Sequence, residues 1–328
     1  MHDTRQREGA PVTAEAIEQA ATGLRAYLPP TPLQYSSAFT PKVGCHVHLK
    51  IEGIQPTRAF KVRGALNKVM RMRPEDRAAG VITASAGNHG LGVAYAAHAF
   101  EVPATVYVPE NANTFKVEAI RRLGGRVVLA GRTYQQAYVE AMRAREASGA
   151  TFVHAYDDPD VVAGQGTIGV ELLDQVPDLD TVLVPVGGGG LIAGVATYLK
   201  TRRPGVHVIG VEPTGADAMT RSLAAGEPVS LERVDTIADG LAASAPGALT
   251  LAIARSCVDR MITVDDAEML RAIRLSFEWE HLLAEPAGAA ALAALLYHYA
   301  PRAGERVVLL LSGANLAEDV LLRALRTR

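Results

Sequence analysis

The chain has 328 residues, of which 48% are hydrophobic and 21% are charged, a composition typical of folded globular proteins. Its 33 basic and 35 acidic residues give a net charge of -2, without the basic excess that binding to a phosphate backbone needs. The two cysteines, Cys45 and Cys257, are too few for a disulfide framework in a chain of this length. These features argue against a nucleic-acid partner and predict a protein of the reducing cytoplasm.

Neither a signal peptide nor a membrane span is predicted. The first 13 residues carry charges of both signs and no apolar core. Residues 181–199 form an uncharged stretch of 19, about the length of a membrane span, but this stretch contains Pro185 and a run of four glycines. We therefore expect a buried strand, a glycine loop and a buried helix there.

The predicted elements follow an alternating order along the chain. Residues 46–52 alternate strictly between apolar and polar side chains, which predicts a half-exposed strand with Lys50 on its polar face. From residue 81 onward, short apolar runs alternate with alanine-rich stretches, a pattern typical of α/β folds with parallel sheets covered on both faces. We predict strands at 81–83, 104–108, 126–129, 181–186, 206–211, 260–264 and 306–311, and helices at 93–99, 134–147 and 268–280.

Lys61 differs from the other lysines because it follows a Gln-Pro-Thr turn at residues 55–57 and the aromatic Phe60. A buried lysine loses part of its charge, since burial lowers its pKa from about 10.4, and its free lone pair can form a Schiff base. An ordinary exposed lysine explains the same local pattern. The residues around Lys61 leave both interpretations open.

Residues 85–90, Ser-Ala-Gly-Asn-His-Gly, lie between a predicted strand and an alanine-rich helix. Ser85, Asn88 and His89 add side-chain donors to a helix N-terminus, which suits a small carboxylate or a cofactor oxygen. Helix capping by Ser85 or Asn88, with His89 in solvent, is the alternative.

A second strand-to-helix junction contains four consecutive glycines, Gly187, Gly188, Gly189 and Gly190. Such a loop exposes backbone N–H groups at a helix N-terminus, where the helix dipole favours a phosphate. A tight turn without a ligand needs only one or two glycines. The run therefore predicts a phosphate site.

Ser312 follows the last predicted strand. Ligands of doubly wound sheets bind at the carboxyl ends of the strands, which predicts Ser312 at the same edge as Gly187 and Ser85. Its neutral hydroxyl suits a bond to a ring nitrogen that stays unprotonated. Capping of the last helix is the alternative role.

Together these segments resemble the fold-type II pyridoxal-phosphate enzymes, and among them the threonine/serine dehydratase and serine racemase group. The resemblance implies a fold related to the β subunit of tryptophan synthase, with two parallel-sheet domains and the cofactor between them. We expect a large domain of residues 1–73 and 151–328 and a small domain of residues 74–150. The matching segments, in the family's order, are residues 31–33, 55–65, 85–90, 187–190, 210–213, 238–240 and 312–315.

The resemblance implies a cofactor role for each motif residue. Lys61 would attach pyridoxal 5'-phosphate and act as the base on the substrate α-carbon. Phe60 would pack near the cofactor ring, and Asn88 would bond the ring hydroxyl. Gly187–Gly190 would cradle the phosphate. Ser312 would face the pyridine nitrogen and leave the ring a weaker electron sink, which favours prompt loss of a β-hydroxyl.

The resemblance also implies a reaction. Ser85, Asn88 and His89 would bind the substrate carboxylate, and a β-hydroxy amino acid of the threonine or serine type would yield a 2-oxo acid and ammonia. Glu285 is a candidate acid for the leaving hydroxyl, with a surface or capping role as the alternative. A homodimer or homotetramer is the family expectation. Feedback inhibition through a carboxyl-terminal regulatory domain, as in long biosynthetic threonine dehydratases, is not expected.

Three departures from the family pattern bear on function. Arg58 and Ala59 precede Phe-Lys where the family usually has Ser, often Gly-Ser. Ala86 stands where serine racemases carry a second serine that acts as an acid, which favours elimination over the alternative, racemisation. One acid of the racemase metal loop is missing, so a divalent metal on Glu212 and Ala216 is left open.

A nicotinamide-dependent dehydrogenase is the alternative from another class. Gly188, Gly190 and Gly194 follow a predicted strand, and Glu212 lies 22 residues beyond Gly190, a spacing close to that of dinucleotide-binding folds. This alternative does not account for Lys61. A non-catalytic cofactor-binding protein is disfavoured because the lysine and the substrate-loop motifs are both intact.

Overall fold

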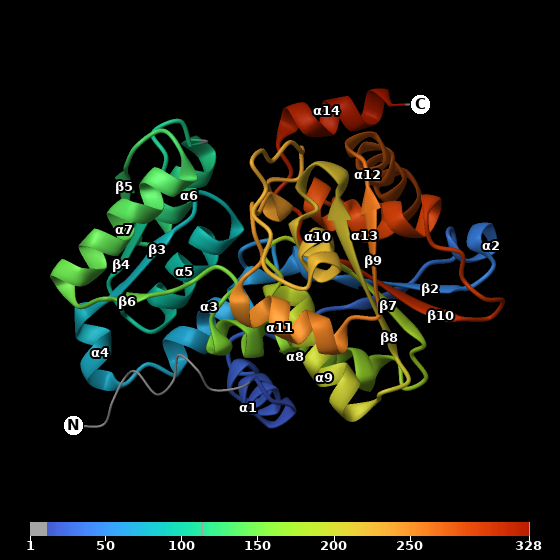
Figure 1. The fold of residues 1–328 in the computed structure, drawn as a ribbon, viewed down its shortest axis with the longest axis horizontal. Coiled ribbons are helices and arrows are strands. Elements are labelled where there is room, and N and C mark those ends of the chain that lie inside the picture. The colour runs from blue at the N-terminus through green and yellow to red at the C-terminus, as the bar shows by residue number, and fades with distance from the viewer. Residues whose placement is uncertain (1–11, 113, 328) are drawn as a thin grey trace.

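The computed structural model describes residues 12–112 and 114–327. Its strands form two sheets that are built mainly from parallel strands and covered by helices, so the α/β prediction is confirmed (Figure 1). Most predicted strands appear within one or two residues of their expected bounds. Strand β6 (Thr151–Phe152) and the antiparallel edge strand β1 (Leu33–Tyr35) were not predicted.

The larger sheet has six strands in the order β1-β2-β10-β7-β8-β9, and only β1 is antiparallel to its neighbour. Its side chains alternate between two cores. Val307 and Leu309 pack in the core that α12 (Asp266–Glu280) and α13 (Pro286–Tyr297) cover. Val308 and Leu310 pack in the core under α8 (Pro159–Gln175) and α9 (Gly190–Arg202). The strands are β1 Leu33–Tyr35, β2 His46–Ile51, β7 Thr181–Pro185, β8 His207–Pro213, β9 Arg260–Val264 and β10 Arg306–Leu311.

The smaller sheet has four parallel strands in the order β5-β4-β3-β6 and lies on the left in Figure 1. Apolar side chains along β3 and β4 alternate between the two faces of this sheet. Helices α5 and α6 pack on one face and α7 packs on the other. The strands are β3 Val81–Ala84, β4 Ala104–Val108, β5 Arg126–Leu129 and β6 Thr151–Phe152.

The helices supply the covering layers. No helix in the described ranges is long and apolar enough to cross a membrane, and residues 181–199 form β7, a loop and most of α9. The α-helices are α1 Ala14–Leu24, α2 Thr40–Val43, α3 Lys61–Met70, α4 Pro74–Ala79, α5 Asn88–Ala99, α6 Thr114–Arg122, α7 Tyr134–Ser148, α8 Pro159–Gln175, α9 Gly190–Arg202, α10 Ala218–Ala225, α11 Ala248–Cys257, α12 Asp266–Glu280, α13 Pro286–Tyr297 and α14 Glu318–Arg326, with 3-10 turns η2 Glu52–Ile54, η3 Thr214–Ala216 and η4 Asp239–Leu241.

Strand β2 corrects one prediction. His46 is exposed and His48 is partly buried, but Lys50 and Glu52 are both 0% exposed. The expected polar face is covered because α8 supplies Glu171, whose carboxylate pairs with the Lys50 ammonium at 2.5 Å. The interpretation of 46–52 as a half-exposed strand is therefore wrong over its second half.

The four-stranded sheet with α4 to α7 occupies residues 74–152, close to the predicted small domain of residues 74–150. Strand β6 pairs with β3 two residues beyond the expected boundary. The division into two domains stays a prediction, with its second boundary better placed after Phe152.

Candidate active site

Three neighbouring parallel strands, β2, β10 and β7, end at one edge of the six-stranded sheet. The segment that leads to Lys61 follows β2, Ser312 follows β10, and Gly187–Gly190 follow β7. Ligands of α/β proteins bind at this edge of a parallel sheet. The topology thus brings three of the predicted site segments together.

Lys61 is the first residue of α3, and its Nζ donates a hydrogen bond to the carbonyl of Ala155 at 2.8 Å. The same Nζ lies 5.2 Å from the centroid of the Phe60 ring. Burial lowers the pKa of Lys61 to about 8, because a low-dielectric environment disfavours the charged amine. A larger share of this amine is therefore neutral and nucleophilic near pH 7 than for an exposed lysine.

Two backbone hydrogen bonds hold the turn before Lys61 against the end of β10. Phe60 donates its N–H to the Ser312 carbonyl at 3.0 Å, and Ala314 donates its N–H to the Arg58 carbonyl at 2.8 Å. Arg58 has a φ of 59°, in the left-handed region that glycine adopts most easily. This conformation explains why glycine is often found here in the family that the sequence resembles.

The glycine loop leaves no room for side chains. A Cβ at Gly188 would overlap the ring of Tyr156, and a Cβ at Gly190 would lie 2.9 Å from the Tyr156 Cα. Gly189 has a φ of 94°, which a residue with a Cβ rarely adopts. Three of the four glycines therefore meet a specific steric or conformational requirement.

The same loop offers hydrogen-bond donors. Among the described residues, no backbone N–H of Gly187, Gly188 or Gly189 donates to another backbone carbonyl. These groups precede α9, a helix of 13 residues whose N-terminus carries partial positive charge. The Gly188 carbonyl, by contrast, accepts a hydrogen bond from Thr250 Oγ1 at 2.7 Å. The loop suits a bound anion such as phosphate.

The loop at residues 85–90 corrects a second prediction. It follows β3 of the four-stranded sheet, so it does not share a sheet edge with Gly187 and Ser312. Helix α5 connects this loop to the site instead. This helix packs so closely on α3 that a Cβ at Gly92 would lie 3.2 Å from the carbonyl carbon of Lys61.

The N-terminus of α5 has no side-chain cap, because Gly87 occupies the cap position. Ser85 lies two residues before this cap position, and its Oγ accepts a hydrogen bond from the Gly87 N–H at 3.3 Å. The first-turn N–H groups of this 12-residue helix form a second place where an anion is favoured. Capping by the side chains of Ser85 or Asn88, the alternative from the sequence, is not what the structure shows.

Asn88 joins the two sheet units through a partly buried polar cluster. Its Nδ2 donates to Glu285 Oε1 at 2.6 Å, and its Oδ1 accepts from Asn315 Nδ2 at 2.7 Å. Glu285 precedes α13 and is only 8% exposed, so a surface role is excluded. Burial raises the pKa of Glu285 to about 7, which makes this carboxyl a candidate acid at neutral pH.

His89 lies inside the protein and not in solvent. Its ring is 3% exposed, and its Nε2 lies 2.9 Å from the Val153 carbonyl. Burial lowers the pKa of His89 to about 3, so the imidazole is neutral. The ring is thus engaged with the β6 segment, which leaves the backbone N–H as the group that can face an anion.

Ser312 is 3% exposed, and its Oγ donates a hydrogen bond to the Ala287 carbonyl at 3.3 Å. The last helix, α14, begins at Glu318 with Ala317 as its cap residue. Ser312 therefore does not cap that helix. A neutral, buried hydroxyl remains at the end of β10.

A buried amine of lowered pKa, together with a side-chain-free glycine loop suited to an anion, fits a cofactor with an aldehyde and a phosphate. The sequence profile of the family described as "Pyridoxal-phosphate dependent enzyme" matches residues 24–313. The chain belongs to this family. Its cofactor is pyridoxal phosphate, and its fold is the fold-type II class that the sequence resembles.

Several relatives of known name cover nearly the whole chain. An L-threonine ammonia-lyase of Thermotoga maritima is 41% identical over 94% of this chain and 77% of its own length. Threonine deaminase isoform 2 of Solanum lycopersicum is 37% identical, with a TM-score of 0.89 over 96% of this chain and 94% of that one. Maize serine racemase is 34% identical, with a TM-score of 0.92 over 96% of this chain and 97% of that one.

The dinucleotide alternative required Glu212 to bind a ribose, and the structure assigns this residue another role. Glu212 is 0% exposed, and its carboxylate accepts hydrogen bonds from the N–H groups of Met219 and Thr220 at 2.9 and 2.8 Å. It thereby holds the N-terminus of α10. The described residues contain no cluster of three His, Cys, Asp or Glu side chains suited to a metal, and a metal on Glu212 and Ala216 stays a prediction.

Sequence reasoning missed two contributors to this site. Tyr156 packs on Gly188 and lies beside the carbonyl that Lys61 binds, yet no local motif marks it. Asn315 was noted only as part of a motif, although it bonds Asn88 directly. Both depend on contacts between segments far apart in the chain.

Proposed function

We propose that this enzyme is an ammonia-lyase that converts a β-hydroxy amino acid of the threonine or serine type into a 2-oxo acid and ammonia. The observation that carries the proposal is the close packing of α5 on the backbone of Lys61 at Gly92, in the second turn of a helix whose N-terminus has no side-chain cap. We infer from this packing that a substrate carboxylate at the N-terminus of α5 lies near the Lys61 amine. The similarity to a threonine ammonia-lyase and a threonine deaminase supports the threonine type.

Most residues that would hold pyridoxal phosphate follow β2, β7 and β10 of the six-stranded sheet, whereas Asn88 begins α5 beside the four-stranded sheet. Gly187–Gly190 would bind its phosphate and Lys61 its aldehyde, while Phe60 would pack near its ring and Ser312 would face its pyridine nitrogen. Asn88 retains a second Nδ2 hydrogen, beyond the one given to Glu285, for the ring hydroxyl. When bound, the cofactor withdraws electrons from the substrate α-carbon.

The chain's own residues then supply binding and proton transfer. Ser85 and the first-turn N–H groups of α5, including those of Asn88 and His89, bind the substrate carboxylate. The Nζ of Lys61 accepts the α-proton, for which its lowered pKa suits it near neutral pH. The departing β-hydroxyl needs a proton. We assign its transfer to Glu285, because a pKa of about 7 leaves this carboxyl partly protonated at neutral pH.

Racemisation is the second candidate, because maize serine racemase shares nearly the whole fold. A racemase needs an acid on the face of the substrate opposite the lysine, and this chain has Ala86 where racemases carry a serine. We propose elimination as the main reaction. A cytoplasmic location and a homodimer or homotetramer stay predictions.

A substrate panel tests the proposal. Purified enzyme is supplied with pyridoxal phosphate and with L-threonine, L-serine, 3-hydroxyaspartate and β-phenylserine, and both ammonia and 2-oxo acid are measured. We expect equal amounts of the two products from at least one of these substrates. Absence of ammonia from all of them, in enzyme shown to contain bound cofactor, would contradict the proposal.

A further inference from the structure

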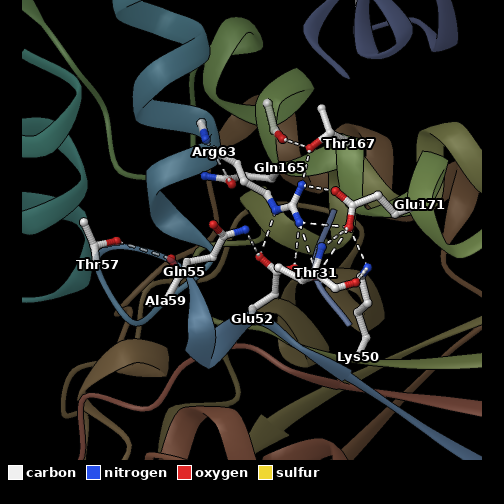
Figure 2. A network of polar contacts seen from close by, with 12 residues as sticks. Thr31, Lys50, Glu52, Gln55, Thr57, Ala59, Arg63, Gln165, Thr167 and Glu171 are labelled. Carbon is white, nitrogen blue, oxygen red and sulfur yellow. Dashed lines mark hydrogen bonds and ion pairs between the residues drawn. The ribbon is translucent and has the colours of Figure 1, made fainter. Parts of the chain in front are cut away.

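A cluster of four buried charges lies behind the Lys61 turn (Figure 2). Lys50 and Glu52 are 0% exposed, Arg63 is 2% exposed and the Glu171 side chain is 14% exposed. Two cations and two carboxylates balance each other in charge. Burial of so many charges is costly unless each is paired, so the cluster has a demanding geometry.

Arg63 is the centre of this cluster. Its Nε and Nη2 bond the two carboxylate oxygens of Glu52, each at 2.8 Å. Its Nη1 and Nη2 bond Glu171 at 2.6 and 3.1 Å, and Nη1 also bonds Thr167 Oγ1 at 3.1 Å. Figure 2 shows the guanidinium between the two carboxylates. Paired bonds on two sides fix the plane of the guanidinium as well as its position.

The three partners come from three different elements. Glu52 begins the turn after β2, Arg63 is in the first turn of α3, and Glu171 is on α8. The Glu52–Arg63 pair therefore joins the two ends of the segment that contains Lys61. Gln55 adds a further bond inside this segment, from its Nε2 to Glu52 at 3.2 Å.

Lys61 and Arg63 leave α3 on nearly opposite sides. Two residues along an α-helix correspond to a rotation of about 200°, so the helix presents Lys61 to the site and Arg63 to the cluster. Phe60 gives the helix no side-chain cap. The first turn of α3 is held by Arg63 and by the Gly64 N–H, which donates a hydrogen bond to Gln165 Oε1 on α8 at 3.2 Å.

Helix packing alone does not set the rotation of α3. Its backbone meets α8 at Gly64, where a Cβ on Gly164 would lie 2.6 Å from the Gly64 Cα. Contact between two glycines fixes how close the helices approach but leaves smooth surfaces that permit rotation. Directional bonds constrain the rotation: the Gly64 N–H donates one to Gln165 Oε1, and the guanidinium of Arg63, one residue away, makes several to Glu52 and Glu171.

We propose that Arg63 is a positioning residue for Lys61. Its guanidinium, held between Glu52 and Glu171, sets the rotation of the first turn of α3 and so directs the Lys61 side chain into the site. This inference rests on the proposed role of Lys61. Identification of the lysine that carries the cofactor in the wild-type enzyme tests that role separately, so failure of either claim can be recognised.

Two variants test the proposal without leaving an unpaired buried charge. Arg63→Lys keeps the charge but loses the paired bonds, and the double variant Glu52→Gln with Arg63→Met removes one charge of each sign. Lys68→Met is the matched control, because Lys68 lies at the other end of α3 and pairs at 2.7 Å with Asp158, the N-cap residue of α8. Circular dichroism and the melting temperature report on folding.

The deciding readout is the reactivity of Lys61 in cofactor-free protein. An amine-acylating reagent is applied across a pH series, and mass spectrometry measures modification of Lys61. We expect a midpoint near pH 8 in the wild type and in Lys68→Met, and a midpoint at least half a pH unit higher in the Arg63 variants. In the loaded enzymes we expect kcat to fall at least tenfold in the Arg63 variants, with KM changed less than threefold.

The proposal is overturned if a folded Arg63 variant keeps the wild-type Lys61 midpoint. It is also overturned if Lys68→Met shifts the midpoint and kcat as much as the Arg63 variants do, because any disturbance of α3 would then suffice. If kcat falls and KM rises by the same factor while the pH midpoint of Lys61 modification is unchanged, the role of Arg63 is purely structural and the proposal is overturned.

Discussion

Asn88 and Glu285, 197 residues apart in the chain, share a hydrogen bond of 2.6 Å. Asn88 starts α5, beside the four-stranded sheet, and Glu285 precedes α13, which covers the six-stranded sheet. The bond therefore connects the two sheet units at the candidate site. Because burial raises the pKa of Glu285 to about 7, the protonation of this contact changes within the neutral range.

The first prediction concerns stability and pH. The folded-state pKa of Glu285, about 7, lies above its ordinary value of 4.5, so its stabilising contribution is complete below pH 4.5 and is lost as the pH rises through 7. Relative to the wild type, Glu285→Gln should gain up to about 3 kcal/mol in unfolding free energy between pH 5 and pH 8. Urea unfolding at each pH measures this difference.

The exposed Glu227 offers a matched control for that experiment. Glu227→Gln should follow the wild-type pH profile throughout. If the unfolding free energies of the wild type and Glu285→Gln differ by the same amount at every pH from 5 to 8, the Glu285 carboxyl does not titrate in this range.

The second prediction concerns the phosphate loop. Gly188→Ala places a methyl group against the Tyr156 ring, whose hydroxyl is bonded to the Ala245 carbonyl at 3.4 Å. We expect the dissociation constant of pyridoxal phosphate to rise at least tenfold, about 1.4 kcal/mol, as measured by fluorescence titration of the cofactor-free protein.

Gly205→Ala is the control for the loop, because no heavy atom lies within 4 Å of a Cβ built at Gly205. Its cofactor affinity should stay within twofold of the wild type. If both variants bind the cofactor equally well, the loop is not the phosphate site.

The third prediction concerns reaction specificity. Ala86 precedes the cap residue of α5 and packs, partly buried, against the core between α5 and α6. The wild type should release ammonia from L-serine much faster than it forms D-serine, and Ala86→Ser should raise the D-serine fraction at least tenfold. Chiral chromatography of the reaction mixture measures both. Rapid formation of D-serine by the wild type would refute the assignment of elimination as the main reaction.

Local motifs predicted the parts of this site that lie within one strand-loop-helix unit. The four glycines from Gly187 and the loop from Ser85 each combine a strand end with a helix start, and the structure has those elements there, whereas α3, which begins at Lys61, was not predicted. Backbone conformation and helix-end electrostatics act over a few residues. A sequence read along one segment therefore contains the necessary information.

The buried charges show what local reading misses. Lys50 looked solvent-exposed because its strand alternates, but its partner Glu171 lies 121 residues away. Arg63 likewise bonds Glu171 across 108 residues. Nothing within the β2 segment reveals that α8 covers it. The placement of Ser85 at the wrong sheet edge has the same cause, because strand order and the split into two sheets depend on packing between distant segments.

The most direct test of the account is to identify the lysine that carries the cofactor. The enzyme with bound pyridoxal phosphate is reduced with borohydride, digested and analysed by mass spectrometry. We predict that the reduced cofactor is attached to Lys61, and that Lys61→Ala loses both the visible absorbance band of the cofactor and the release of ammonia. Attachment to another lysine, or full activity in Lys61→Ala, would contradict the central claim.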